Sequence, residues 1–145
     1  MDLAVDGFTV GRLEQLLSEM DEIHFSEVSI YEAKAKIHRL SLRNEDYRPA
    51  LAAFGENLQV LREDEKVRFR QYTLEDDHRF NHLADQPTSL DVFDMVIVAQ
   101  AAEAGRLLTE DHEILGVRDA PWLRGHPMQG LRITSWREAS EGLTR

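Results

Sequence analysis

The sequence predicts an α/β sandwich with a mostly parallel sheet. Segments with the apolar spacing of amphipathic helices alternate with short strand-like runs, and no hairpin turn joins two of those runs. The chain has 145 residues, of which 42% are hydrophobic and 30% charged, a balance typical of a soluble globular protein. We therefore expect residues 1–145 to form a single domain.

The first half of the chain contains one predicted strand among three predicted helices. Residues 9–21 carry apolar side chains at helical spacing, and residues 22–25 form a short run that suits a strand. Ser26 is expected to cap a helix that reaches about residue 40. Pro49 fits the first turn of another helix, which ends near residue 61.

The second half continues the alternation. Residues 67–72 alternate apolar and basic side chains, which predicts an edge strand with one face in water. Thr73 precedes an acid-rich segment and is expected to cap a helix that ends near residue 84. The most regular predicted helix spans residues 90–104 and ends at Gly105. Two more strands, residues 106–109 and 131–134, and a last helical segment, residues 136–141, complete the chain.

Composition excludes several classes of protein. The chain has no cysteine, which excludes disulfides, zinc–thiolate sites, iron–sulfur clusters and cysteine nucleophiles. The longest apolar run, residues 95–102, is interrupted by Gln100 and is too short to span a bilayer. The first residues do not follow the pattern of a signal peptide, a basic region and then an apolar stretch. We expect a soluble cytoplasmic protein with no membrane partner.

The charge restricts how this chain could approach nucleic acid. Asp and Glu outnumber Lys and Arg by 27 to 17, which gives a formal net charge of −10. Proteins held to nucleic acid by overall electrostatics are normally basic. An acidic chain needs either carboxylates that bind a divalent cation or a locally basic segment. Residues 117–145 are such a segment, with five arginines against three acids.

The clearest candidate site lies between residues 94 and 111. Asp94 is near the start of a predicted helix, whereas Thr109 and Asp111 lie where the next strand ends. A helix start and a strand end can share one edge of an α/β sheet, the edge at which ligands collect. Two carboxylates there suit Mg²⁺ or Mn²⁺, which prefer oxygen ligands. The alternative is that both acids only cap helices, because the helix dipole favours acids in the first turn.

Two further acids have a functional and a structural interpretation. Asp91 either faces the same site or caps the helix, and capping is favoured. Glu32 lies in a predicted helix beside apolar residues, so that a buried Glu32 would need a partner or a metal. An exposed Glu32 would instead pair with Lys36 four residues later, and this interpretation is favoured. The aromatic residues expected in the core are Phe25, Phe93, Trp122 and Trp136.

Two segments resemble those of PIN-domain nucleases. The residues Phe25-Ser-Glu-Val-Ser-Ile-Tyr-Glu32 are similar to the family's segment in which a strand ends in Ser and the next helix supplies a Glu. The residues Asp94-Met-Val-Ile-Val-Ala, followed by Leu108-Thr-Glu-Asp111, resemble its Asp-x-x-Ile-x-Ala and Thr-x-Asp pattern. The two matches extend over about residues 22–115, and residues 31–36 are most similar to archaeal members.

The resemblance implies a three-layer α/β/α sandwich and a Mg²⁺- or Mn²⁺-dependent endoribonuclease. It implies that Glu32, Asp94 and Asp111 hold the metal and that Thr109 orients Asp111 or a metal-bound water. The implied reaction is hydrolysis of an RNA phosphodiester bond by a metal-activated water. Many relatives are VapC-type toxins, so the implied partners are RNA, an antitoxin and a second copy of the chain.

The N-terminal segment departs from the family pattern. PIN domains begin with a buried strand that ends in an Asp ligand, for which this chain offers only Asp2 and Asp6. Nineteen residues separate Asp6 from Ser26, too few for the family's first helical region. We therefore expect the domain to be incomplete at its N-terminus, without the first strand and its Asp. The alternative function is then a non-catalytic PIN-like binding module that lacks a complete metal site.

Overall fold

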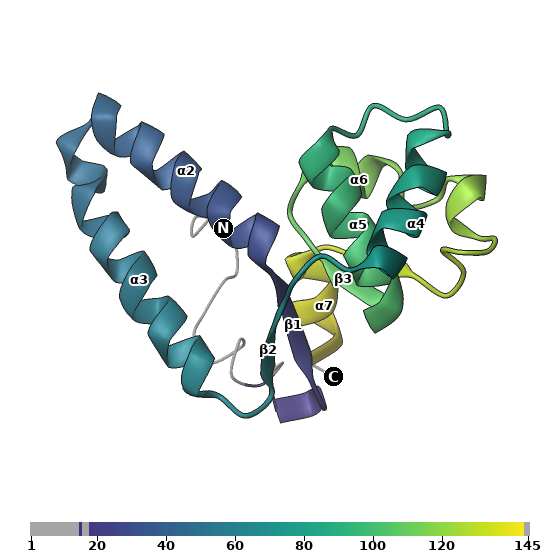
Figure 1. The fold of residues 1–145 in the computed structure, drawn as a ribbon. Helices are drawn as coiled ribbons and strands as arrows, with labels where there is room; N and C mark the ends of the chain where they lie inside the picture. Colours follow the sequence, from purple (N-terminus) through teal and green to yellow (C-terminus); the bar gives the residue numbers. More distant parts are fainter. Residues whose placement is uncertain (1–14, 16–17, 144–145) are drawn as a thin grey trace. The chain divides into compact units, whose positions relative to one another are not determined.

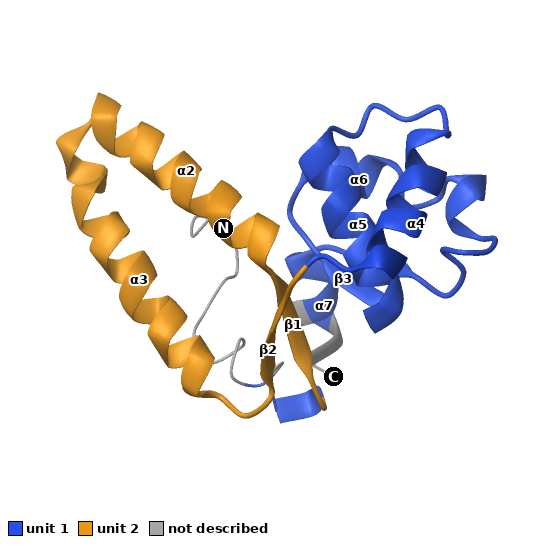
Figure 2. Cartoon of the chain, in the orientation of Figure 1, with its two compact units in different colours: residues 1–20, 72–145 blue, residues 21–71 orange. Residues whose placement is uncertain are grey.

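The computed structural model describes residue 15 and residues 18–143, and every strand pair in this part of the chain is parallel. The chain divides into two units (Figures 1 and 2). Unit 1 comprises residues 1–20 and 72–145, and unit 2 comprises residues 21–71. Each unit contains one pair of parallel strands and the helices that connect them. The predicted α/β class is therefore confirmed.

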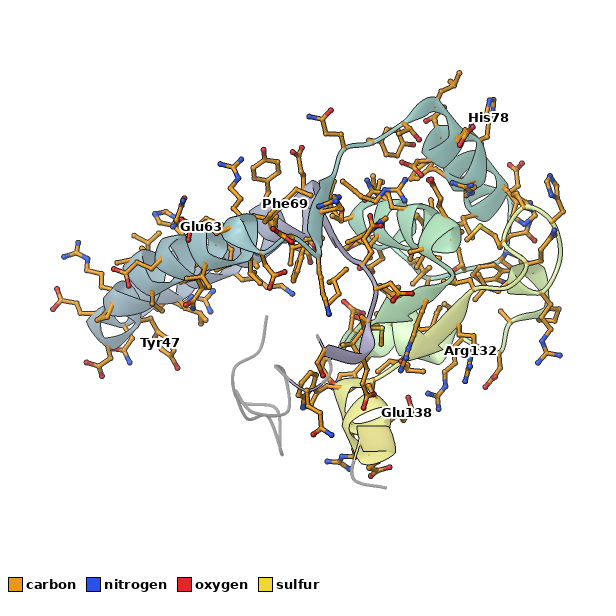
Figure 3. All side chains as sticks on the ribbon, turned by 90° about the horizontal axis from the view of Figure 1, so that it is seen from below. Tyr47, Glu63, Phe69, His78, Arg132 and Glu138 are labelled. Carbon is orange, nitrogen blue, oxygen red and sulfur yellow. The ribbon has the colours of Figure 1, made fainter. Side chains whose placement is uncertain are left out.

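Unit 2 is a strand pair whose two strands are connected by a long helical hairpin, with Tyr47 at its tip (Figure 3). Parallel strands need such a crossover because the end of the first strand and the start of the second lie at opposite edges of the sheet. The register places Phe25 opposite Phe69. In chain order the elements are β1 (Ile23–Ser26), α2 (Glu27–Arg43), the 3₁₀-helix η1 (Glu45–Tyr47), α3 (Arg48–Glu63) and β2 (Val67–Arg70).

The hairpin is held by contacts of long side chains rather than by a deep core. No residue of α2 or α3 is fully buried. The Lys34 ammonium of α2 donates a hydrogen bond to the Leu51 carbonyl at 3.1 Å and lies 5.5 Å from the ring centre of Phe54, both on α3. The rings of Phe25 and Phe69 stack on the strand pair at 6.0 Å. These contacts leave much of each helix exposed.

Unit 1 packs its helices around the second strand pair, in which Leu107 lies opposite Ile133. The elements are α4 (Leu74–Ala84), α5 (Val92–Ala104), β3 (Arg106–Leu108), α6 (His112–Gly116), η2 (Pro121–Leu123), β4 (Arg132–Thr134) and α7 (Trp136–Leu143). The buried apolar cluster consists of Leu83, Leu90, Val98, Ala99, Ile114, Leu123, Met128 and Ile133.

Helix ends follow the sequence where a local motif specifies them. Thr73 and Asp76 form a reciprocal capping box at the start of α4, with bonds of 3.2 and 2.9 Å. Gly105 ends α5 with φ 83°, in the left-handed region that glycine adopts without strain. Ser26 is the N-cap residue of α2, as predicted, but its side chain makes no capping hydrogen bond.

Other differences concern lengths and exposure. Helix α2 continues to Arg43, beyond its predicted end, and the short elements α6 and η2 were not predicted. Phe93 is 56% exposed rather than buried, whereas Trp136 is buried as expected. Phe93 lies in the first turn of α5, whereas the buried residues of this helix, apart from Asp94, are the consecutive residues 98–101 further along it. The predicted helix of residues 9–21 falls mostly outside the described residues, as do Asp2 and Asp6.

Candidate metal centre

The acids of unit 1 gather where its strands end. The backbone N–H of Thr109, just after β3, donates to the carbonyl of Thr134 at 3.0 Å, so that the carboxyl ends of β3 and β4 lie side by side. Asp111 begins α6 shortly after β3, and α7 follows β4 after a single residue. In parallel sheets, this edge is where ligands bind.

Two side-chain hydrogen bonds bring further helix starts to the same edge. The Ser89 hydroxyl, just before α5, donates to Oε2 of Glu113 in the first turn of α6 at 3.0 Å. Oε1 of Glu110 accepts a hydrogen bond from the backbone N–H of Trp136, the first residue of α7. The N-termini of α5, α6 and α7 are therefore connected through contacts within unit 1.

Asp94 is the buried carboxylate of this edge. It is the third residue of α5 and is 6% exposed. Its backbone N–H donates to Oδ1 of Asp91 at 2.8 Å, which confirms the interpretation of Asp91 as the N-cap. The partial positive charge of a helix N-terminus favours a carboxylate at this position. Asp94 thus combines burial with a backbone that is fixed by its neighbour.

Asp111 caps α6 and keeps one carboxylate oxygen exposed to other ligands. Oδ1 accepts hydrogen bonds from the backbone N–H groups of Glu113 at 2.9 Å and Ile114 at 3.2 Å. Within the described part of the chain, Oδ2 accepts none. The N–H of Asp111 donates to Oγ1 of Thr109 at 3.1 Å. Thr109 therefore fixes the backbone that aims the carboxylate.

Thr134 is a residue of this edge that sequence analysis missed. Its Oγ1 is buried and has no hydrogen-bond partner among the residues that the structure describes. A buried hydroxyl without a partner costs about 1–3 kcal/mol, which a ligand at this edge could offset. The sequence signal was weak: Thr134 ends its strand much as Thr109 follows β3, but only the pairing of β3 with β4 brings them together.

Glu138, on α7 (Figure 3), is an acid whose role is structural. Hydrogen bonds from the Ser135 backbone N–H at 2.8 Å and from the Arg118 guanidinium at 2.7 Å lower the pKa of Glu138 below its ordinary value. Both bonds favour the ionised carboxylate. These contacts account for Glu138 without a metal ion.

Glu32 lies in α2 of unit 2, whereas Asp94 and Asp111 belong to unit 1. Its Oε1 lies 3.5 Å from the Lys36 ammonium, so that the expected ion pair is present, and its side chain is 27% exposed. In neither unit do the described residues contain three His, Asp or Glu side chains grouped to hold a metal ion. A joint site of Glu32, Asp94 and Asp111 stays a prediction.

The oxygen atoms near this edge are of the chemical kind that a hard divalent cation binds. Asp94 and Asp111 have carboxylate oxygens, and Thr109 and Thr134 have hydroxyls; that these residues bind one cation together stays a prediction. Mg²⁺ and Mn²⁺ bind through such oxygens, with water completing their coordination. The open Oδ2 of Asp111 and the orphaned Oγ1 of Thr134 are the two observations that leave capacity for a ligand.

One of three comparisons with known proteins identifies a family. The family model of the PIN domain matches residues 8–119, which is most of the chain. Comparisons with curated proteins and with solved structures give no match. In the described part of the chain, no helix has both the length and the apolar character needed to cross a membrane.

PIN domains are α/β proteins, and the helices and parallel strands described above are consistent with a three-layer α/β/α sandwich. Members of the family are generally metal-dependent nucleases that bind RNA and typically use divalent ions. Because the match covers most of its length, this chain belongs to the PIN domain family.

Proposed function

We propose that this chain is a Mg²⁺- or Mn²⁺-dependent endoribonuclease that hydrolyses RNA phosphodiester bonds. The observation that supports this function best is the hydrogen bond between Ser89 and Glu113, which connects the helix start of Asp94 to that of Asp111. Both carboxylates therefore belong to one edge of unit 1, the edge where the strands end. An oxygen-rich edge of this kind is what a metal-dependent phosphodiesterase needs.

Each residue has a defined role in the proposal. Asp94 and Asp111 would hold the cation together with Glu32 of α2, and Thr109 is a positioning residue that acts through the backbone of Asp111. When bound, the cation supplies an activated water and stabilises the attacking and leaving oxygens of the phosphodiester. Helix-cap hydrogen bonds hold the carboxylate of Asp111 and the backbone of Asp94 in place, so that these two residues need little reorganisation when RNA binds.

A narrower proposal concerns the biological setting. The similarity of residues 25–32 and 94–111 to PIN-domain nucleases, many of which are VapC-type toxins, supports a cytoplasmic toxin that is restrained by an antitoxin and acts as a homodimer. Expression in cells tests it directly: the wild-type chain should arrest growth, whereas the Asp94→Asn variant should not. Co-expression of the antitoxin with the wild-type chain should restore growth. Growth unaffected by an actively cleaving chain would argue for RNA processing instead.

The decisive experiment is cleavage of a labelled single-stranded RNA with and without Mn²⁺. We expect the Asp94→Asn variant to lose activity by about 100-fold or more, because an amide is a poor substitute for a metal-bound carboxylate. Asp85→Asn is the matched control, since Asp85 is an exposed acid at the end of α4. Equal activity of wild type and Asp94→Asn, or cleavage that persists in a chelator, would contradict the proposal.

A non-catalytic binding module is the second candidate function. The observation in its favour is that Asp91, Asp111 and Glu138 all make helix-capping bonds, which explain these acids without a metal. Thermal unfolding with Mn²⁺ separates the two functions. A metal enzyme should be stabilised by Mn²⁺ in the wild type but less in Asp94→Asn, whereas a module without a site should show no shift in either.

A further inference from the structure

One face of α2 carries a row of basic side chains. Lys36, Arg39 and Arg43 follow one another at spacings of three and four residues, which places them on the same side of the helix. We call these three residues the basic stripe. Together with Leu40 they line one shallow groove of about 290 Å³. Glu32, one turn before Lys36, lies on the same face and pairs with it at 3.5 Å.

The stripe differs in charge from the chain that carries it. The net charge of the chain is −10, but residues 33–44 contain four Lys or Arg and no Asp or Glu. The side chain of Lys36 is 57% exposed. Neither Arg39 nor Arg43 has an ion-pair partner in the part of the chain that the structure describes. The two arginines are therefore available to a polyanion.

The length of the stripe fits a nucleic-acid strand. Arg43 lies seven positions after Lys36, which corresponds to about 10 Å along the helix axis. The three cations are therefore spread over a length at which they can contact more than one phosphate of the same strand. Guanidinium groups also suit phosphate because their donors bind two oxygens at once.

We propose that the basic stripe binds the phosphate backbone of RNA and leads the strand toward Glu32. The inference rests on the proposed function, because it treats Glu32 as part of the metal centre. A phosphate held by Lys36 lies about one helical turn from Glu32, within the reach of a neighbouring phosphodiester. The stripe also gives an acidic protein a local surface that attracts RNA.

The test measures RNA binding rather than cleavage, so that it does not depend on the metal site. A fluorescent single-stranded RNA is titrated with protein in a chelator at several salt concentrations. We compare wild type with the triple variant Lys36→Gln, Arg39→Gln, Arg43→Gln. We expect affinity to fall about tenfold or more and the slope of log affinity against log salt to fall by about 2, because three phosphate contacts are lost.

A charge-matched control uses three exposed arginines outside both the stripe and the basic segment of residues 117–145, Arg48, Arg62 and Arg106, each changed to Gln. This variant has the same net charge but should keep the wild-type salt slope. The single change Arg39→Glu is a second variant that disturbs less of the surface and should weaken binding by repulsion. Circular dichroism melts establish that the variants are folded.

Three results would overturn the inference: an unchanged salt slope in the stripe variant, an equal loss in the control variant, or stripe-dependent binding of polyglutamate without stripe-dependent binding of RNA. The last result would assign the stripe to an acidic protein partner. Stripe-dependent RNA binding by a chain that does not cleave would support the inference and contradict the proposed function. RNA cleavage by a chain whose RNA binding does not depend on the stripe would support the proposed function and contradict the inference.

Discussion

The hydroxyl of Ser89 donates a hydrogen bond to Oε2 of Glu113 at 3.0 Å, across 24 residues of sequence. Ser89 precedes α5, which carries Asp94, and Glu113 follows the N-cap Asp111 of α6. The bond therefore connects the two acid-bearing helix starts without using either acid. It makes the geometry of the candidate metal centre depend on a serine that belongs to neither of the two sequence motifs.

Removing the hydrogen bond between Ser89 and Glu113 should weaken both the stability of unit 1 and its binding of metal. We expect Ser89→Ala to lower the free energy of unfolding by about 0.5–1 kcal/mol, because the hydrogen bond is partly exposed to water. We also expect Mn²⁺ affinity to fall about tenfold, as is common when an outer contact of a metal site is lost. Urea unfolding and calorimetric titration measure the two effects. Ser41→Ala, which removes a local bond within α2, should leave Mn²⁺ affinity unchanged.

Thr109 should affect metal binding through Asp111. In Thr109→Val the N–H of Asp111 loses its acceptor, so that the backbone that positions the carboxylate is held less firmly. We expect the Mn²⁺ dissociation constant to rise about 10–100-fold, whereas Thr109→Ser, which keeps the hydroxyl, should stay close to wild type. Calorimetry compares the variants. Equal affinities in Val and Ser variants would exclude the positioning role.

The capping box of α4 allows a clean test of local stability. We expect Thr73→Ala to lower the free energy of unfolding by about 1 kcal/mol, because the N–H of Asp76 loses its side-chain acceptor. Thr73→Ser retains the oxygen and should cost much less. Denaturant unfolding followed by circular dichroism distinguishes them. A Ser variant as unstable as the Ala variant would show that the threonine methyl, not the cap, stabilises the helix.

Tyr72 should make stability depend on alkaline pH. Partial burial, the hydrogen bond to Asp77 at 2.8 Å and the charges of Asp77 and Asp76 raise the pKa of Tyr72 from 10.0 to about 12. The unfolded chain therefore loses this proton first. The contribution to stability is complete below about pH 10 and is lost as the pH rises through 12.

Absorbance of the tyrosinate ion, compared with Tyr72→Phe, reports this titration. The variant Asp77→Asn removes the nearest negative charge and should lower the pKa of Tyr72 toward its ordinary value. Asp85→Asn is the control, because Asp85 does not contribute to the shift. An unchanged titration in Asp77→Asn would mean that Asp77 does not contribute and that burial and the charge of Asp76 raise the pKa of Tyr72.

The parts of the fold that sequence analysis located are those that local interactions determine. Thr73 and Gly105 mark helix ends because a side-chain cap and a left-handed φ are properties of single positions. Ser26 shows the limit: the residue type and the position were right, but its side chain does not make the capping bond. Helix α6 has only five residues, too few for a periodic pattern to show.

The candidate site could be predicted only in part, for a related reason. Asp94, Thr109 and Asp111 lie in recognisable local patterns, whereas Thr134 and Ser89 matter only through partners far along the chain. Phe93 was assigned to the core by its residue type, yet it is exposed in the first turn of α5, because burial along this helix depends on which elements pack against each turn. A single sequence does not show which elements, far apart along the chain, contact each other in the fold.

The tip of the helical hairpin offers a place for a reporter. Asp46 is exposed in η1, and its backbone N–H, which any residue would keep, donates to Oδ1 of Asn44 at 3.0 Å. The chain has no cysteine, so Asp46→Cys would create a unique thiol for a fluorophore. A dye at this point lies a few residues beyond Arg43 and clear of both strands of unit 2. The fluorescence of a dye at this position would therefore report the binding of a ligand to α2.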